Sequence, residues 1–205
     1  MLLFRPVGLE ELGLIYDSGM RAFPPRLPDQ PIFYPVTNEA YAKQIARDWN
    51  TKAGTLGGFV TRFSVDDSYA AKFERRVVGS REHEELWVPA EELTEFNNHI
   101  GDAIDVIAAY FGEGYRGFVP ETFGLKGKDA AAQCLALART LPYSGFDVIC
   151  EMAANNKAVF LNFFFWEQHS FAAELSDAER DAALAKLRAV WALRERAAFP
   201  LGVVR

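Results

Sequence analysis

In the first half of the chain, apolar residues fall into short runs, and segments with helical spacing lie between these runs. Each run is short and rich in β-branched and aromatic side chains, which is typical of strands. The predicted strands cover residues 2–5, 32–36, 59–65, 75–78, 85–88 and 104–111. Between them, apolar residues such as Leu9, Leu12 and Ile15 share one helical face. This order predicts an α+β fold in which helices flank a mixed β-sheet.

Capping and turn residues agree with this pattern. Asn38 is suited to capping a helix that follows the second strand, and Pro89 is suited to the first turn of another helix. Residues 23–31 contain four prolines, which exclude a helix or a central strand there. No Gly-x-Gly-x-x-Gly motif follows the first strand, which argues against a doubly wound dinucleotide-binding fold.

The second half has a different order of helical and strand-like segments, which predicts an αββα subdomain. An alanine-rich segment, residues 128–141, predicts a helix that Pro142 ends. A capping box that opens at Ser176 predicts a last helix reaching about residue 196.

Between these helices, two apolar runs predict a β-hairpin. They cover residues 145–154 and 158–166, on either side of the Asn155-Asn156 pair, which suits a tight turn. With this turn, the residues that oppose each other on one face are all apolar. The opposed pairs are Met152–Val159, Cys150–Leu161, Val148–Phe163 and Phe146–Phe165.

This difference between the two halves of the sequence predicts two domains. Residues 112–120 contain several glycines and a proline and form the expected linker. The predicted boundaries are residues 1–118 for the first domain and residues 119–205 for the αββα subdomain.

Composition narrows the possible partners and surroundings. Half of the residues are apolar, which is enough for a sizeable core, and the net charge is −6 with a pI near 5.2. Without a Lys/Arg-rich block, nucleic acid is disfavoured as a partner. The longest apolar run, residues 158–166, is too short to span a membrane. Cys134 and Cys150 lack metal-ligand spacing and are expected to be buried free thiols in a cytoplasmic protein.

Three segments of the first half place a polar residue on or beside an apolar strand that leads into a helix. They are the segments around Arg5, around Tyr34 to Thr37, and around His83 to Glu85. Their order and spacing resemble the three-part NAD-binding signature of ADP-ribosyltransferases, in which Arg or His, then Tyr or Ser/Thr, then Glu meet in one cleft. The resemblance covers about the first 110 residues and implies a split β-sheet of ADP-ribosyltransferase type.

The resemblance also implies roles for individual residues. Glu85 and His83 are the expected catalytic residues, and the Glu85 carboxylate would stabilise an oxocarbenium-like centre on the ribose of NAD. His83 takes the place that Glu or Gln usually has two positions earlier, which leaves the acceptor type open. Arg5 would hold a phosphate or a ribose hydroxyl, and Tyr34 would stack on the nicotinamide ring. Thr37, together with Thr61, is a further candidate for the middle polar position.

Each of these residues also has a purely structural interpretation. Arg5 could end an exposed strand, Tyr34 could be a core aromatic, and residues 81–85 could be a charged turn. The three histidines are too far apart in sequence to predict a metal site.

Three functions are therefore compatible with the sequence. The first is an enzyme that uses NAD as a substrate and transfers ADP-ribose to a protein acceptor, or cleaves NAD. The second is a non-catalytic protein-interaction module that keeps a degenerate cleft, and the third is an immunity-type protein. The sequence predicts neither the acceptor nor the oligomeric state.

Overall fold

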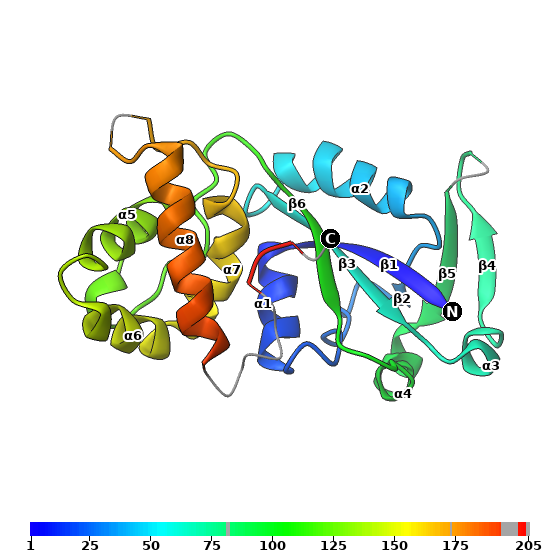
Figure 1. The fold of residues 1–205 in the computed structure, drawn as a ribbon. Coiled ribbons are helices and arrows are strands. Elements are labelled where there is room, and N and C mark those ends of the chain that lie inside the picture. The colour runs from blue at the N-terminus through cyan, green and yellow to red at the C-terminus, as the bar shows by residue number, and fades with distance from the viewer. Residues whose placement is uncertain (81–82, 173, 194–200, 204–205) are drawn as a thin grey trace. The chain divides into compact units, whose positions relative to one another are not determined.

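The computed structural model describes residues 1–80, 83–172, 174–193 and 201–203. The chain divides into an N-terminal unit, Met1–Glu113, and a C-terminal unit that begins at Gly114 and extends to Val203 (Figure 1). The division falls at the start of the segment predicted as a linker. Among the described residues, no helix is long and apolar enough to cross a membrane.

The strands of the N-terminal unit form two small sheets. One has the order β1–β3–β6 and the other the order β2–β5–β4. The bounds of the strands are Leu2–Gly8 for β1, Ile32–Phe33 for β2, Gly57–Ser64 for β3, Glu74–Val77 for β4, Glu84–Pro89 for β5 and Asp105–Phe111 for β6. The expected α+β class is thus confirmed.

The two sheets meet at Val36. Its backbone exchanges two hydrogen bonds of 2.8 Å with Phe4 of β1. On its other side, Val36 forms an antiparallel bridge with Glu85 of β5. We call this junction the Val36 seam.

The strand pairings in both sheets are antiparallel, whereas the sequence predicted a mixed sheet. The difference arises after α1 (Leu9–Asp17), which is only about 14 Å long at 1.5 Å per residue. The proline-containing segment from 18 to 31 is long enough to return the chain over that distance. Residues 32–36 can then run antiparallel to β1.

Helices cover both faces of the β1–β3–β6 sheet. Helix α2 (Glu39–Asp48) lies along one face, where Ala42 and Ala46 pack with Phe4 and Val60 (Figure 1). A Cβ on Gly58 of β3 would overlap the carbonyl oxygen of Ala46, so glycine permits this close approach.

An aromatic cluster fills the other face. Phe33 lies 4.9 Å from Phe23 and 5.5 Å from Phe96, measured between ring centroids, and Phe63 lies 4.8 Å from Phe23. Phe96 belongs to α4 (Leu93–Asn98), which therefore packs on the face opposite α2. The remaining short helices of this unit are η1 (Asn50–Lys52), α3 (Asp67–Ala70) and η2 (Ala90–Glu92).

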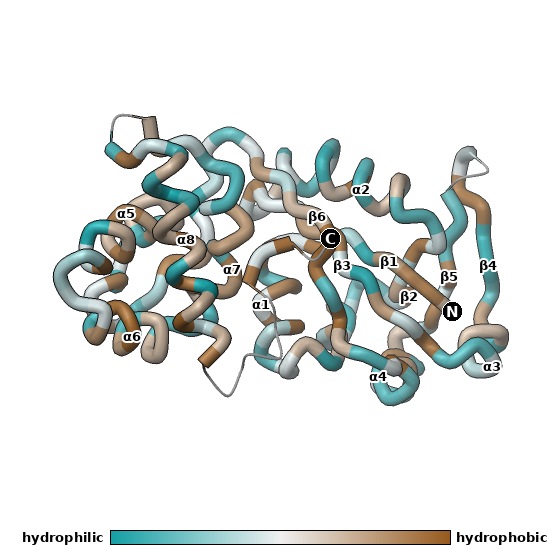
Figure 2. Tube along the Cα trace, viewed as in Figure 1, coloured by the Kyte–Doolittle hydropathy of each residue, from teal (hydrophilic) through white to brown (hydrophobic). Residues whose placement is uncertain are grey.

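Strand β4 is an exposed edge whose residues are largely charged, and Figure 2 shows it mostly in the hydrophilic colour. Charged side chains on an edge strand discourage pairing with other chains.

The C-terminal unit is helical in the described residues. Its elements are η3 (Phe123–Leu125), α5 (Ala130–Thr140), α6 (Gly145–Ala154), α7 (Asn156–Trp166) and α8 (Asp177–Ala192). The predicted hairpin is wrong, and with it the αββα subdomain, because both of its runs are helices.

The cause of this error is visible in α6 and α7. The Ser144 side chain accepts a hydrogen bond of 3.2 Å from the Asp147 backbone and caps α6. The buried residues of α6, Val148 and Met152, are four apart, which is helical spacing. Helix α7 is buried on every side from Ala158 to Trp166, so its apolar run carries no periodicity that separates helix from strand.

A polar network inside this unit surrounds Asn162 of α7, which is fully buried. Its side chain bonds the backbone N–H and carbonyl of Phe118, both at 2.8 Å, and the side chain of Gln133 at 2.9 Å. Gly117 has a φ of +72°, and a Cβ there would overlap the Asn162 amide oxygen. The network anchors the segment that precedes α5.

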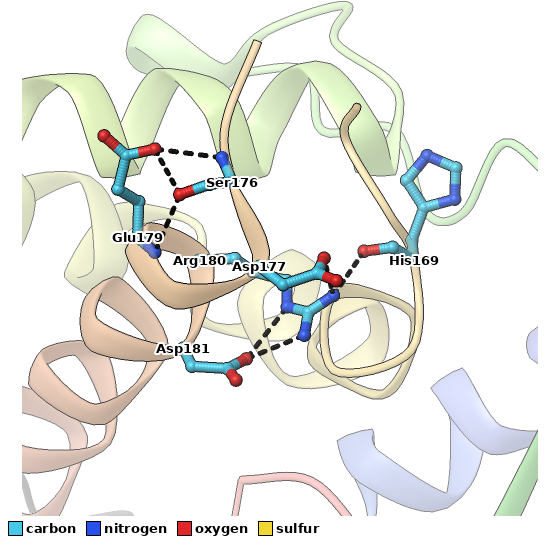
Figure 3. Close-up of polar contacts among 6 residues, drawn as sticks. All are labelled: His169, Ser176, Asp177, Glu179, Arg180 and Asp181. Atoms are coloured by element: carbon cyan, nitrogen blue, oxygen red, sulfur yellow. Dashed lines mark hydrogen bonds and ion pairs between the residues drawn. The ribbon is translucent and has the colours of Figure 1, made fainter. Parts of the chain in front are cut away.

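The predicted capping box at Ser176 is present and opens α8 (Figure 3). One turn later, Arg180 donates to the backbone carbonyl of His169 at 2.9 Å and pairs with Asp177 and Asp181. The predicted end of this helix near residue 196 lies outside the described residues.

Candidate functional site

Glu85 lies on the α2 face of the β2–β5–β4 sheet, beside the Val36 seam. Residues that oppose each other in an antiparallel pair share a face, so Glu85, Val36 and Phe4 all point toward α2. One oxygen of the Glu85 carboxylate accepts a hydrogen bond of 3.4 Å from the Tyr41 hydroxyl. The other oxygen accepts a bond of 3.1 Å from the indole N–H of Trp87. The two side chains hold the carboxylate from two directions.

Aromatic rings surround this carboxylate. Tyr34 meets Trp87 edge to face, with the ring centroids 5.2 Å apart. His83 stacks on Tyr41 at 4.0 Å with the rings inclined by 13°. We call Tyr34, Tyr41, His83, Glu85 and Trp87 the Glu85 cluster. Its members are half-buried except for Tyr41, which is 7% exposed.

The cluster already attracts one cation. The guanidinium carbon of Arg76, on the neighbouring strand β4, lies 3.7 Å from the centre of the Trp87 ring. Such stacking is favourable because the face of an indole ring is electron-rich. The pKa of Tyr41 is raised by burial and then by the negative charge of Glu85, so its hydroxyl stays protonated and donates.

The structure does not bring Arg5 to this cluster. Consecutive strand residues point to opposite faces, so Arg5 leaves the sheet on the face opposite Phe4. There its guanidinium donates to both oxygens of Glu11 at 2.8 and 3.3 Å and to the Tyr34 carbonyl at 3.3 Å. It also lies 4.5 Å from the centre of the Phe33 ring. At 7% exposure, Arg5 is part of the packed interior.

The two candidate threonines have structural contacts. Thr37 donates to the Glu84 carbonyl through its backbone N–H at 3.1 Å and through its hydroxyl at 3.5 Å. The Thr61 hydroxyl donates to the Arg5 carbonyl at 2.9 Å and is fully buried. Thr37 therefore holds the segment after Val36 against β5, and Thr61 links β3 to β1.

Of the residues predicted from the sequence, Tyr34, His83 and Glu85 come together. Sequence reasoning missed Tyr41 and Trp87, which complete the cluster. A signal for Trp87 was present, because it stands two residues after Glu85 and must share its face of β5. Tyr41 fitted the apolar stripe of α2 equally well, and nothing in that stripe marked its hydroxyl.

Two hollows lie away from the cluster. One of about 340 Å³ lies in the N-terminal unit and is lined by Pro6, Gly8, Leu9, Glu10, Glu11, Asn50, Ala53, Gly54, Thr55 and Gly57. Another of about 190 Å³ lies in the C-terminal unit between η3, α5 and α6. None of the lining residues belongs to the Glu85 cluster. In the part of the chain that the structure describes, no group of three or more His, Cys, Asp or Glu side chains could hold a metal ion.

Comparisons with protein-family models, curated proteins and solved structures find no match to this chain. The resemblance to ADP-ribosyltransferases accordingly stays a prediction from the sequence.

Proposed function

We propose that the N-terminal unit binds NAD with the nicotinamide ring at the Glu85 cluster and cleaves the bond between nicotinamide and ribose. ADP-ribose would pass to water or to a protein acceptor. The observation that supports this proposal most is the Glu85 carboxylate, held by Tyr41 and Trp87 among aromatic rings. These groups match the charge and shape of a planar cation.

The chemistry requires few groups. The bond between C1′ of the ribose and the ring nitrogen breaks, and its electron pair leaves with nicotinamide, which becomes neutral. C1′ becomes oxocarbenium-like, and a nearby carboxylate lowers the energy of that state. Water or an acceptor nucleophile then bonds to C1′ and loses a proton to solvent. Glu85 is the residue that we assign to stabilising C1′.

The guanidinium stacked on Trp87 supports the same interpretation. Arg76 lies where the cluster presents an electron-rich ring face, on an exposed strand. A pyridinium ring has the same planarity and charge as this guanidinium and would be recognised by the same groups. The proposal gives Arg5 no contact with NAD, because its donors are directed to Glu11 and Tyr34.

The test is nicotinamide release from NAD by the purified full chain and by Glu85→Gln. Glutamine keeps the shape of the side chain but removes its charge, so we expect the rate to fall at least about 100-fold. Glu84→Gln is the matched control, because it removes the same charge one residue earlier, where the side chain points to the other face. Equal rates for the wild type and Glu85→Gln would contradict the proposal.

A non-catalytic interaction module, including one of immunity type, is the second candidate. It is favoured by Arg5, whose ion pair with Glu11 removes one of the three NAD contacts that the resemblance implies. This candidate predicts that the wild type releases no nicotinamide.

A further inference from the structure

We infer that Tyr41 and Trp87 are positioning residues, which hold the Glu85 carboxylate in one orientation and so set the rate of the chemical step. The inference rests on the proposed function. It concerns the two residues of the cluster that donate hydrogen bonds to the carboxylate, one from a helix and one from the strand of Glu85 itself.

Trp87 is itself held in place. Its indole N–H donates to Glu85 at 3.1 Å, while the Tyr34 ring meets it edge to face and the Arg76 guanidinium stacks on it. A tryptophan side chain has only two rotatable bonds, so contacts on several sides leave the N–H with one direction. That direction is toward Glu85.

Tyr41 is fixed from a separate element. Its backbone N–H donates to the capping side chain of Asn38 at 3.2 Å, in the first turn of α2. Its ring belongs to the hydrophobic cluster that includes Phe4, Val36 and Ala42, and it stacks on His83. The helix cap therefore fixes the backbone of Tyr41, and the His83 ring beside β5 holds its side chain next to Glu85.

The two hydrogen bonds leave the Glu85 carboxylate able to accept further hydrogen bonds from a substrate. An ionised carboxylate has about four acceptor positions, and each Glu85 oxygen uses one of them for Tyr41 or Trp87. The remaining positions are available to a ribose hydroxyl. Because rates depend steeply on the placement of the charged group, loss of either donor should lower kcat rather than weaken NAD binding.

The experiment measures nicotinamide release by Tyr41→Phe, which loses only the hydroxyl, and by Trp87→Phe, which keeps an aromatic ring but loses the indole N–H together with part of the ring surface. We expect kcat to fall roughly 10- to 100-fold in both variants, with little change in KM for NAD in Tyr41→Phe. The matched controls are Tyr143→Phe and Trp49→Phe, because both side chains are exposed and neither residue belongs to the cluster. Both controls should keep the wild-type kcat.

A double-mutant cycle separates positioning from a general effect on the fold. In the Glu85→Gln background, Tyr41→Phe and Trp87→Phe should cause no further loss, because the group through which they act has been removed. An equal loss in both backgrounds would overturn the inference.

An NMR spectrum of the protein supplies a measurement that does not depend on turnover. The indole N–H resonance of Trp87, assigned by its disappearance in Trp87→Phe, should move in Glu85→Gln while that of Trp49 stays in place. An unmoved Trp87 resonance would overturn the inference. The amide resonances of the same spectra show whether each variant is folded.

The two proposals fail in different ways. Absence of nicotinamide release from the wild type overturns the proposed function and the inference together. Release by the wild type that stays unchanged in Tyr41→Phe or in Trp87→Phe overturns the inference alone.

Discussion

Arg5 is a charged residue whose environment gives it a structural role. Its guanidinium is enclosed by the Glu11 carboxylate, the Phe33 ring and the Tyr34 carbonyl. Arg26 lies near this pair, and its pKa is lowered by burial and then by the positive charge of Arg5. The Glu11 carboxylate opposes this effect and raises the pKa of Arg26, so it lies within reach of both cations.

We predict that Arg5→Ala lowers the free energy of unfolding by about 3 kcal/mol, because it removes the buried member of the ion pair with Glu11 and its packing on Phe33. The resemblance predicted weaker NAD binding for this variant, whereas the structure predicts a loss of stability. Urea unfolding measures the effect. The double variant Arg5→Ala/Glu11→Ala should lose less than the sum of the two single variants. An unchanged urea midpoint for Arg5→Ala would show that the pair does not stabilise the fold.

The helices α6 and α7 give an element-scale test of the C-terminal unit. In the predicted hairpin, Phe146 and Phe163 both lay on the apolar face. In the structure, Phe163 is fully buried, whereas Phe146 is 73% exposed on α6.

We therefore predict that Phe163→Ala lowers the free energy of unfolding by about 3–5 kcal/mol, and that Phe146→Ala has little effect. The two variants remove the same atoms, so each is the control of the other. Thermal unfolding followed by circular dichroism measures both. Similar destabilisation by the two substitutions would favour the hairpin over the helices.

The elements that could be predicted from the sequence are those with local signals. Asn38 caps α2, and Ser176 and Glu179 form the capping box of α8, because these side chains act within one turn. The strands of the N-terminal unit were also found, since they alternate or end at turn residues. Strand direction was not predictable, because it depends on where the segment from 18 to 31 leads the chain.

The candidate site was predictable only in part, for a related reason. Tyr34 lies just after β2 and Glu85 lies on β5, which pairs with β2, and their pattern marked them in the sequence. Arg5 lies on the opposite face of the sheet from these two residues. This follows because Phe4 pairs with Val36 and shares its face, and Arg5 is the next residue along β1. Pairing of strands distant in sequence leaves no local signal, so the position of Arg5 required the structure.

At the scale of the whole molecule, both cysteines lie in the C-terminal unit. Cys134 is buried in α5, and burial raises its pKa to about 12. Cys150 is exposed on α6, in contrast to its expected burial. Labelling of thiols consequently measures the accessibility of side chains in the C-terminal unit alone.

We predict that a thiol reagent at pH 8 labels Cys150 in the folded protein, and that Cys134 reacts only when the C-terminal unit opens. The thiolate is the reactive form, and a pKa of about 12 keeps Cys134 protonated at this pH. Mass spectrometry of the labelled chain, with and without urea, measures the two sites. Cys150→Ser is the control and should leave the folded protein unlabelled. Rapid labelling of Cys134 in the folded protein would contradict the packing of α5.

The Val36 seam makes the candidate site sensitive to chain length. Tyr34 precedes Val36 by two residues, and Trp87 follows Glu85 by two, so the cluster depends on even spacing along both strands. An insertion or deletion of one residue between Tyr34 and Val36 would turn Tyr34 to the far face, although every residue type would be retained. A substitution at this junction therefore leaves the strand register unchanged, whereas a change of its length does not. The segment from 18 to 31 holds no member of the cluster. A change of its length by one residue therefore does not alter the even spacing between Tyr34 and Val36.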